Sequence, residues 1–230
     1  MPGENHMITP DTITIDGPAG AGKSTVGELL AQRLGFLYFD TGTMYRALTW
    51  AALQHGVDPD DGVAATELAR RVDIEVLPPS ADDGRQYTVI VDGQDVTWEL
   101  RQPEVERHVS RVAGHPTVRE IMRARQRAIG LRGQVVMVGR DIGNIVMPDA
   151  PLKIYLEATL EERARRRAAE LRARGQNVSA ADVQADVARR DALDQHVMAA
   201  APDAVLIHSD GRSPAEVVES ILEHVARAAH

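Results

Sequence analysis

The sequence of 230 residues contains no cysteine, and this absence removes several kinds of chemistry. Disulfide bonds, thiolate nucleophiles and zinc sites built on cysteine are all excluded. No apolar run approaches the roughly 20 residues that a membrane-spanning helix needs. The first six residues lack a basic stretch followed by an apolar one, so we expect no secretory signal there. These absences predict a soluble cytoplasmic protein in which residues 1–9 form a flexible tail.

Lysine is also scarce in this chain. Of the 26 basic residues, only Lys23 and Lys153 are lysines, and the other 24 are arginines. The net charge of −8 at pH 7 disfavours a nucleic-acid polymer as the main partner, because such binding depends on cations placed at phosphates. A guanidinium group can instead hold a single phosphate through two hydrogen bonds. Arginines in recognisable motifs are therefore candidates for binding a small phosphorylated ligand.

One motif carries most of the functional information. It follows an apolar strand expected at residues 12–16, precedes a helix expected at residues 24–34, and matches the pattern G-x-x-x-x-G-K-[ST]. Glycines let the backbone fold around a phosphate, and the helix directs N–H groups and the positive end of its dipole at the same place. Lys23 supplies a cation for the β- and γ-phosphates, and the Ser24 hydroxyl is a candidate ligand for Mg²⁺. The complete phosphate-binding loop (P-loop) reads Gly17, Pro18, Ala19, Gly20, Ala21, Gly22, Lys23, Ser24 and Thr25.

Strands and helices alternate through most of residues 10–230, which we expect to form a single domain. Residues 135–138 are continuously apolar, as expected of a central parallel strand covered on both faces. The alternation predicts an α/β fold with a doubly wound parallel sheet. Residues 72–100 differ, because they combine short β-rich runs with turn residues and the hairpin pair Asp92-Gly93. They predict a small antiparallel β insertion in the main body.

Three motifs fall at the carboxyl ends of predicted strands, where sheets of this kind bind ligands. They are the P-loop, residues 40–46 and residues 139–141. A GTPase would normally add an N-K-x-D motif, which is absent, and a large motor ATPase would need a longer chain. A small-molecule kinase fits the length, and it needs cations for its acceptor. Arg46 and Arg140 are placed to supply them.

Simpler interpretations of the charged residues remain open. Residues 40–46 could be a helix cap followed by a solvated arginine. The pair Arg140-Asp141 could be a structural salt bridge. Arg163 and Arg167 lie four apart on one helix face, near glutamates that make ordinary helix pairs.

The motifs together resemble those of bacterial cytidylate kinases, in the group of P-loop kinases that act on nucleoside monophosphates. The matching segments cover nearly the whole chain in the order of that family. They are residues 17–25, 40–46, 109–113, 116–119, 139–143 and 148–151, Arg189-Arg190-Asp191, and Asp194. The resemblance implies phosphoryl transfer from ATP to CMP or dCMP, with Mg²⁺, by a monomer. It also implies that residues 72–100 bind the monophosphate and that about 160–198 form a short helical lid.

The resemblance assigns a role to each matching residue. Lys23, Arg140, Arg163 and Arg167 would be the catalytic cations, the last two in the lid over ATP. Tyr45, Arg46 and Arg140 would hold the acceptor phosphate, close to Thr41. Cytosine would be recognised by Ser110, Arg119 and Asp141. The Asp141 carboxylate can accept a hydrogen bond from the amino group of cytosine, whereas uracil has a carbonyl group at that position. Arg190 and Asp194 would approach the sugar.

The chain departs from the family at Val197, where the family pattern has a further arginine. One cation for the transition state is therefore not supplied by that position, and Arg166 or Arg167 is a candidate to replace it. Two other functions stay open at this point. The chain could be a kinase for UMP or another small acceptor, or a P-loop nucleotide sensor without turnover.

Overall fold

The structure is a computed structural model that describes residues 10–173, 175–194 and 199–228, without the side chains of residues 190, 193 and 194. The chain divides into two compact units. The first contains Met1–Phe36 and Gln134–His230, and the second contains Leu37–Gly133. The predicted tail, residues 1–9, lies outside the described residues.

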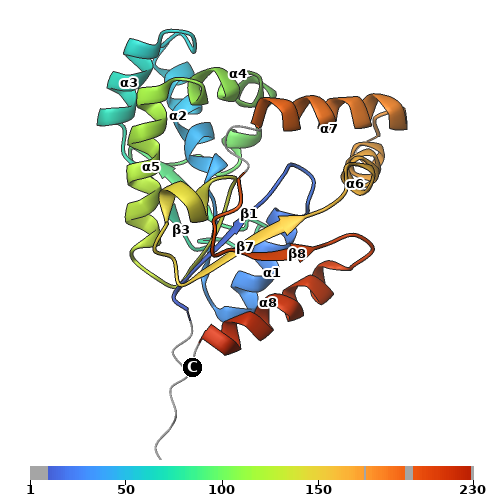
Figure 1. Ribbon diagram of the computed structural model, residues 1–230. Helices are drawn as coiled ribbons and strands as arrows, with labels where there is room; N and C mark the ends of the chain where they lie inside the picture. Colours follow the sequence, from blue (N-terminus) through green and yellow to red (C-terminus); the bar gives the residue numbers. More distant parts are fainter. Residues whose placement is uncertain (1–9, 174, 195–198, 229–230) are drawn as a thin grey trace, which may run out of the picture. The chain divides into compact units, whose positions relative to one another are not determined.

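A parallel sheet forms the centre of the first unit. Its strands are β1 (Thr12–Asp16), β6 (Val135–Val138), β7 (Leu152–Glu157) and β8 (Val205–His208), arranged in the order β6-β1-β7-β8. β1 and β6 are buried along their whole length, which explains why β6 is continuously apolar. All four strands run the same way, so their carboxyl ends lie at one edge (Figure 1).

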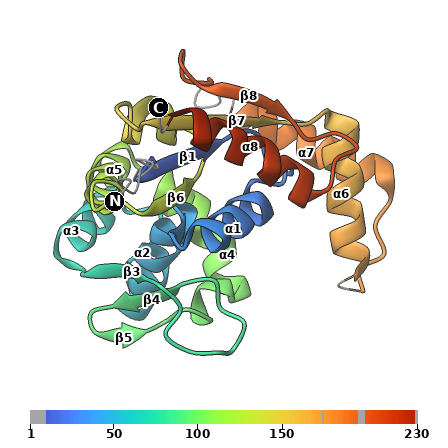
Figure 2. The same cartoon turned by 90° about the horizontal axis from the view of Figure 1, so that it is seen from below.

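Helices of the first unit follow the strands. They are α1 (Lys23–Leu34), the π-helix η2 (Ile142–Val146), α6 (Leu160–Ala173), α7 (Ala180–Asp194) and α8 (Pro214–Ala228). Figure 2 shows α1 and α8 side by side, and both helices contact the sheet. α6 and α7 pack on each other through a small apolar cluster formed by Ala164, Ala168, Val183 and Val187. α1, η2, α6 and α8 each follow a strand of this sheet in the chain. Their first residues therefore lie near the carboxyl ends of the strands, where a ligand site is expected.

The second unit combines helices with a small antiparallel sheet. In chain order it contains β2 (Leu37–Asp40), α2 (Gly42–Gln54), α3 (Gly62–Arg71), β3 (Ile74–Leu77), β4 (Thr88–Val91), β5 (Gln94–Asp95), the 3₁₀ helix η1 (Glu99–Arg101), α4 (Pro103–Ala113) and α5 (Pro116–Gly130). β4 pairs with both β3 and β5 in antiparallel fashion. The β4–β5 turn has positive φ angles at Asp92 (47°) and Gly93 (82°), as a tight two-residue hairpin requires.

The predicted α/β fold with a parallel sheet and a small antiparallel sheet is confirmed. The last strand of the insertion is short, since β5 ends at Asp95. The Asp95 carboxylate accepts hydrogen bonds from the Thr97 amide (3.0 Å) and hydroxyl (2.6 Å), which turns the chain out of the strand. The π-helix η2 was not predicted. No helix in the described ranges is long and apolar enough to cross a membrane.

Candidate active site

The P-loop wraps the start of α1 in a conformation that depends on glycine. Gly17 has φ 142°, and a Cβ atom there would collide with the carbonyl oxygen of Leu156 in β7. Gly22 has φ 94° and is the N-cap of α1. No other residue type adopts both conformations without strain. The glycines predicted from the motif are therefore required by the path of the backbone itself.

The first turn of α1 opens into a cavity of about 1180 Å³. Ala19–Val26 line one side of it, and Ser24 and Thr25 are exposed there. The Lys23 ammonium group donates a hydrogen bond to the Pro18 carbonyl at 2.8 Å, across the loop. A helix N-terminus together with a lysine gives this cavity a positive potential at one end, suited to a phosphate chain.

Arg163 of α6 is bound to the P-loop and to α7. It is 6% exposed, and its guanidinium donates to the Ala19 carbonyl at 3.1 Å. Its two terminal nitrogens also meet the two carboxylate oxygens of Asp191 at 2.8 and 2.6 Å. The catalytic role expected of Arg163 stays a prediction, and these contacts favour a role in positioning the loop and the lid helices.

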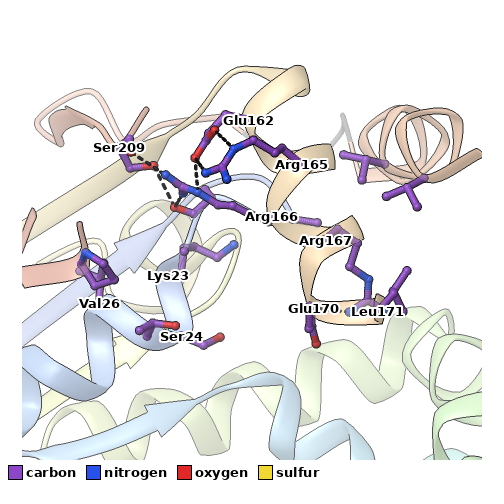
Figure 3. A pocket seen from close by; sticks show the side chains of 18 of the residues that line it. Lys23, Ser24, Val26, Glu162, Arg165, Arg166, Arg167, Glu170, Leu171 and Ser209 are labelled. Atoms are coloured by element: carbon purple, nitrogen blue, oxygen red, sulfur yellow. Dashed lines mark hydrogen bonds and ion pairs between the residues drawn. The ribbon is translucent and has the colours of Figure 1, made fainter. Parts of the chain in front are cut away.

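Arg166 makes a second connection between α6 and the P-loop (Figure 3). It donates to the Ala21 carbonyl at 3.1 Å and to the Ser209 carbonyl at 2.6 Å. Glu162 accepts from Arg166 at 2.7 Å, and hydrogen bonds from Arg165 and then Arg166 lower the pKa of Glu162 to about 2. The guanidinium of Arg166 is thus committed to holding the base of α6.

Arg167 differs from its two neighbours on α6. It lines the same cavity, and its side chain is 34% exposed. Its guanidinium donates a hydrogen bond to Glu170, one turn further along the helix, at 2.7 Å. Figure 3 shows it beside Glu170 and Leu171, away from Ser209. An exposed pair of this kind is worth only a few tenths of a kcal/mol, so Arg167 can exchange Glu170 for a phosphate at little cost.

A second group of predicted residues lies after β6. Asp141 is buried (8% exposed), and Arg140 before it is half-buried. The carboxylate of Asp16, the last residue of β1, lies next to this segment and accepts hydrogen bonds from the Ile142 and Gly143 amides. Burial raises the pKa of Asp16 to about 6, with Asp141 adding to the rise and Lys23 opposing it. The charges of Lys23 and Asp141 therefore both influence the pKa of the same buried carboxyl group, that of Asp16.

In the second unit, the start of α2 carries the residues expected at the acceptor phosphate. The guanidinium of Arg119 lies 5.8 Å from the ring centroid of Tyr45, a cation–π arrangement. Arg46 donates to Glu106 at 2.7 Å. Burial lowers the pKa of Arg46, but Asp40 and Glu106 outweigh it and raise the pKa above the ordinary value. Arg46 therefore stays fully charged.

Neighbouring residues support the start of α2. Thr41 is buried, and its carbonyl accepts from Gln126 of α5 at 3.4 Å. The Thr43 hydroxyl donates to Tyr87 at 2.8 Å, and the Tyr87 ring stacks on Tyr38 with 5.9 Å between centroids. Ser110, predicted to read cytosine, is exposed on α4. Tyr87, just before β4, thus connects the small sheet to α2.

Three predicted positions fall where the structure gives no side-chain description. Arg190 and Asp194 lie on α7, but their side chains are outside the described part of the structure. Val197 lies outside the described residues altogether. Their expected contacts to the sugar and the missing lid cation stay predictions.

Sequence reasoning missed Asp16, Ser209 and Glu106. A usable signal existed for Asp16, because an ionisable residue closes an otherwise apolar strand at the edge where ligands bind. Glu106 and Ser209 carried no such signal, since their partners are 60 and 43 residues away in sequence. Among the described residues, no group of three or more His, Cys, Asp or Glu side chains could hold a metal ion.

Comparisons with known proteins identify the family of this chain. The family model of cytidylate kinase matches residues 13–227. A cytidylate kinase of Roseiflexus castenholzii is 63% identical over 221 residues, covering 96% of this chain and 95% of the relative. Another, of Chloroflexus aggregans, is 59% identical over 216 residues, covering 94% of each chain. The solved structure of shikimate kinase from Bacteroides thetaiotaomicron is similar in fold, with a TM-score of 0.50, 12% identity, and coverage of 93% of this chain and 97% of that one. The chain belongs to the cytidylate kinase family.

Proposed function

We propose that this protein transfers the γ-phosphoryl group of ATP to CMP or dCMP, giving ADP and CDP or dCDP. The observation that carries the proposal is the P-loop cavity with Lys23 at its end, in a chain 63% identical to a cytidylate kinase along almost its whole length. ATP is the donor that the cavity suits, because the loop and the α1 terminus offer backbone N–H groups to a polyphosphate.

On the donor side, each residue has a separate task. Residues Gly17–Thr25 hold the phosphates of ATP, and Lys23 neutralises charge on the β- and γ-phosphates. Arg167 binds the γ-phosphate from the lid. Its ion pair with Glu170 is partly exposed, so breaking it to bind the phosphate costs little free energy. Arg163 and Arg166 keep the P-loop in shape through the carbonyls of Ala19 and Ala21.

On the acceptor side, Tyr45, Arg46 and Arg140 hold the monophosphate, with Thr41 at the same helix start. Ser110, Arg119 and Asp141 recognise cytosine, and Arg190 and Asp194 bind the sugar. Asp141 suits cytosine because a carboxylate accepts a hydrogen bond from the exocyclic amino group. The carbonyl oxygen of uracil at the same position would be repelled by the carboxylate.

Mg²⁺ accompanies ATP in this proposal. The Ser24 hydroxyl is an exposed hard oxygen in the first turn of α1, within the cavity. Mg²⁺ commonly takes one or two ligands from the protein and the rest from phosphates and water, so a single hydroxyl fits this ion. When bound, the ion would neutralise charge on the phosphates of ATP. Lys23 orients the same phosphates from the side of the loop.

The protein has little covalent work to do in this reaction. It must align an oxygen of the acceptor phosphate with the γ-phosphorus and keep water away. No general base is required, because a phosphate monoester with a second pKa of about 6 is already largely ionised at neutral pH. Closure of the lid region, about residues 160–198, would exclude water and so prevent wasteful hydrolysis of ATP.

A panel of acceptors tests the proposal most directly. Purified protein with ATP and Mg²⁺ should form ADP much faster with CMP or dCMP than with UMP, AMP or water. The variant Asp141→Ala should lower kcat/KM for CMP by about tenfold to a hundredfold and change UMP use far less, because one hydrogen bond to cytosine is lost. Equal rates with CMP and with water would overturn the proposal. Tight ATP binding without transfer to any monophosphate would favour a nucleotide sensor instead.

Several expectations stay predictions from the sequence. They are the monomeric state, the location in the cytoplasm, and the division into a tail, a single P-loop kinase domain, a monophosphate-binding insertion and a lid. The preference between CMP and dCMP is decided by the same panel.

A further inference from the structure

Asp16 is a buried carboxyl group that none of the roles above uses. It closes β1 immediately before Gly17, and it is 6% exposed. Burying a carboxylate costs free energy unless its oxygens are well hydrogen-bonded. Asp16 therefore needs strong local partners, and they come from a distant part of the sequence.

Both oxygens of Asp16 accept hydrogen bonds from the backbone after Asp141. The Ile142 amide donates to one at 2.9 Å, and the Gly143 amide donates to the other at 2.7 Å. Ile142 and Gly143 are the first two residues of the π-helix η2, whose own N-cap side chain, Asp141, makes no cap hydrogen bond. Asp16 thus caps this helix from another strand, in place of the N-cap side chain.

The fit between β1 and this segment is close. A Cβ atom at Gly143 would lie 2.8 Å from Thr14 Oγ1 and 3.3 Å from Asp16 Oδ2. Gly143 therefore lets the backbone approach β1 closely enough for the carboxylate to reach both amides. A neutral amide side chain could accept from only one of the two donors and would oppose the other with its own N–H groups.

We propose that Asp16 is a positioning residue for the acceptor nucleotide, because its carboxylate holds the segment that carries Arg140 and Asp141. This inference rests on the proposed function of those two residues. Since Asp16 directly precedes the P-loop, its carboxylate also ties the loop that binds the donor to the segment that binds the acceptor. Misplacement of Asp141 by a fraction of an ångström is enough to weaken recognition of cytosine.

The test compares Asp16→Asn with Thr14→Val. Thr14 lies two residues earlier on the same strand face, is fully buried, and its hydroxyl has no hydrogen-bond partner among the described residues. Hydrogen exchange of the Ile142 and Gly143 amides should become at least about tenfold faster in Asp16→Asn, because charge-assisted bonds are lost. The KM for CMP should rise at least about tenfold while the KM for ATP changes less than about threefold. Thr14→Val should leave all three measurements near the wild-type values.

Two results would overturn the proposal. Unchanged exchange in Asp16→Asn would show that the carboxylate does not hold the segment. A raised KM for ATP with an unchanged KM for CMP would show that Asp16 serves the donor. Wild-type turnover of CMP is measured first, so its absence would refute the proposed function and the acceptor role together. Normal wild-type turnover with unchanged exchange in the variant would refute the Asp16 proposal alone.

A second variant covers the case in which Asp16→Asn does not fold. Gly143→Ala should separate the Asp16 carboxylate from the Ile142 and Gly143 amides by a change in η2 and not in β1. The added methyl group would collide with the Thr14 hydroxyl on β1. This variant should raise the KM for CMP in the same way, and adding Thr14→Ala should restore part of the loss by making room. A normal KM for CMP in Gly143→Ala, with accelerated exchange of the two amides, would contradict the proposal.

Discussion

The arginines of the two units differ in what they contact. In the first unit, Arg163 and Arg166 donate to carbonyl oxygens of the P-loop and to acidic side chains, in partly or fully buried positions. In the second unit, Arg46 forms an ion pair with the half-exposed Glu106 and is also kept charged by Asp40, and Arg119 lies over an aromatic ring. A guanidinium that satisfies several backbone groups is part of the scaffold. A guanidinium whose ion-pair partner is partly exposed can exchange that partner for a ligand phosphate at low cost.

The same contrast exists within α6. Arg163 and Arg167 lie four residues apart, and the family resemblance gave both the same catalytic role. The structure gives the first a bidentate partner on α7 and leaves the second 34% exposed in the cavity. Proximity to a phosphate site therefore does not distinguish an arginine that binds ligand from one that shapes the site.

The largest expected effect concerns the one cation of the cavity that comes from the P-loop itself. Lys23→Ala should lower kcat by a factor on the order of 10³, because the P-loop then lacks its own cation at the β- and γ-phosphates. The matched control is Arg33→Ala on the same helix, whose partner Glu219 is exposed and which lies outside the cavity. Steady-state assays with CMP measure both, and unchanged turnover in Lys23→Ala would contradict the P-loop assignment.

The next effect separates the two arginines of α6. Arg163→Met should lower the free energy of unfolding by roughly 3 kcal/mol, because Asp191 loses its partner in a largely buried pair. Arg167→Ala should change stability by less than about 0.5 kcal/mol but lower kcat at least about tenfold. Urea unfolding and steady-state kinetics measure the two variants side by side. A stable Arg163→Met with a large loss of kcat would return Arg163 to the catalytic role.

The pair of Arg46 and Glu106 tests the contrast from the second unit. Arg46→Ala should raise the KM for CMP by about tenfold to a hundredfold, because charge-assisted hydrogen bonds to the phosphate are lost. Glu106→Gln should leave stability within about 1 kcal/mol of the wild type, since the pair is partly exposed. It should also leave the KM for CMP equal or a few-fold lower, because Arg46 is released. If Glu106→Gln is strongly destabilised, Arg46 has a structural role like that of Arg163 and Arg166, and the contrast between the two units fails.

The smallest effect is the dependence of stability on pH. The pKa of Asp16 is raised from 3.8 to about 6 by burial, with Asp141 adding to the rise and the Gly143 amide, the Ile142 amide and Lys23 opposing it. Tyr155, opposite Asp16 on β7, stays neutral in this range because its own pKa is raised. Between pH 4 and 6 the native state binds the proton more tightly than the unfolded chain does. The contribution of Asp16 to stability therefore falls as pH rises through this window.

Denaturation of wild type and Asp16→Asn at several pH values measures this contribution. Acidic residues with lowered pKa values, such as Glu162, stabilise in the opposite direction, so only the difference between the two proteins is informative. The unfolding free energy of the wild type minus that of the variant should fall by on the order of 2 kcal/mol between pH 4 and 7. A difference independent of pH would mean that the Asp16 carboxyl is not perturbed in the native state.

Features with a local cause could be predicted well. The turn at Asp92-Gly93 and the glycine conformations of the P-loop depend on backbone angles that few residue types adopt. The cap of α8 has an equally local cause, because the amide and hydroxyl of Ser213 both donate to Glu216 only three residues away. Such features need no knowledge of the rest of the chain.

Features made between distant segments could not be predicted. The amides of Ile142 and Gly143 bind a carboxylate 126 and 127 residues earlier, and Arg163 meets Asp191 from another helix. Nothing near Ile142 in the sequence indicates a π-helix, because the group that caps it comes from β1. Long-range contacts are specified by packing, which a reading of local patterns does not contain.

The sequence by itself determined the phosphate-binding loop, the α/β class and the membership of a kinase family, since each rests on local backbone requirements or on motifs in a fixed order. Only the tertiary structure decided how the charged residues are used. It placed Arg163 and Arg166 on the carbonyls of the P-loop, left Arg167 at the cavity, and brought Asp16 under the segment of Asp141. The physical reason is that burial and hydrogen-bond partners set the free energy needed to break the contacts of a charged side chain. That free energy decides whether the side chain holds the fold together or binds a ligand.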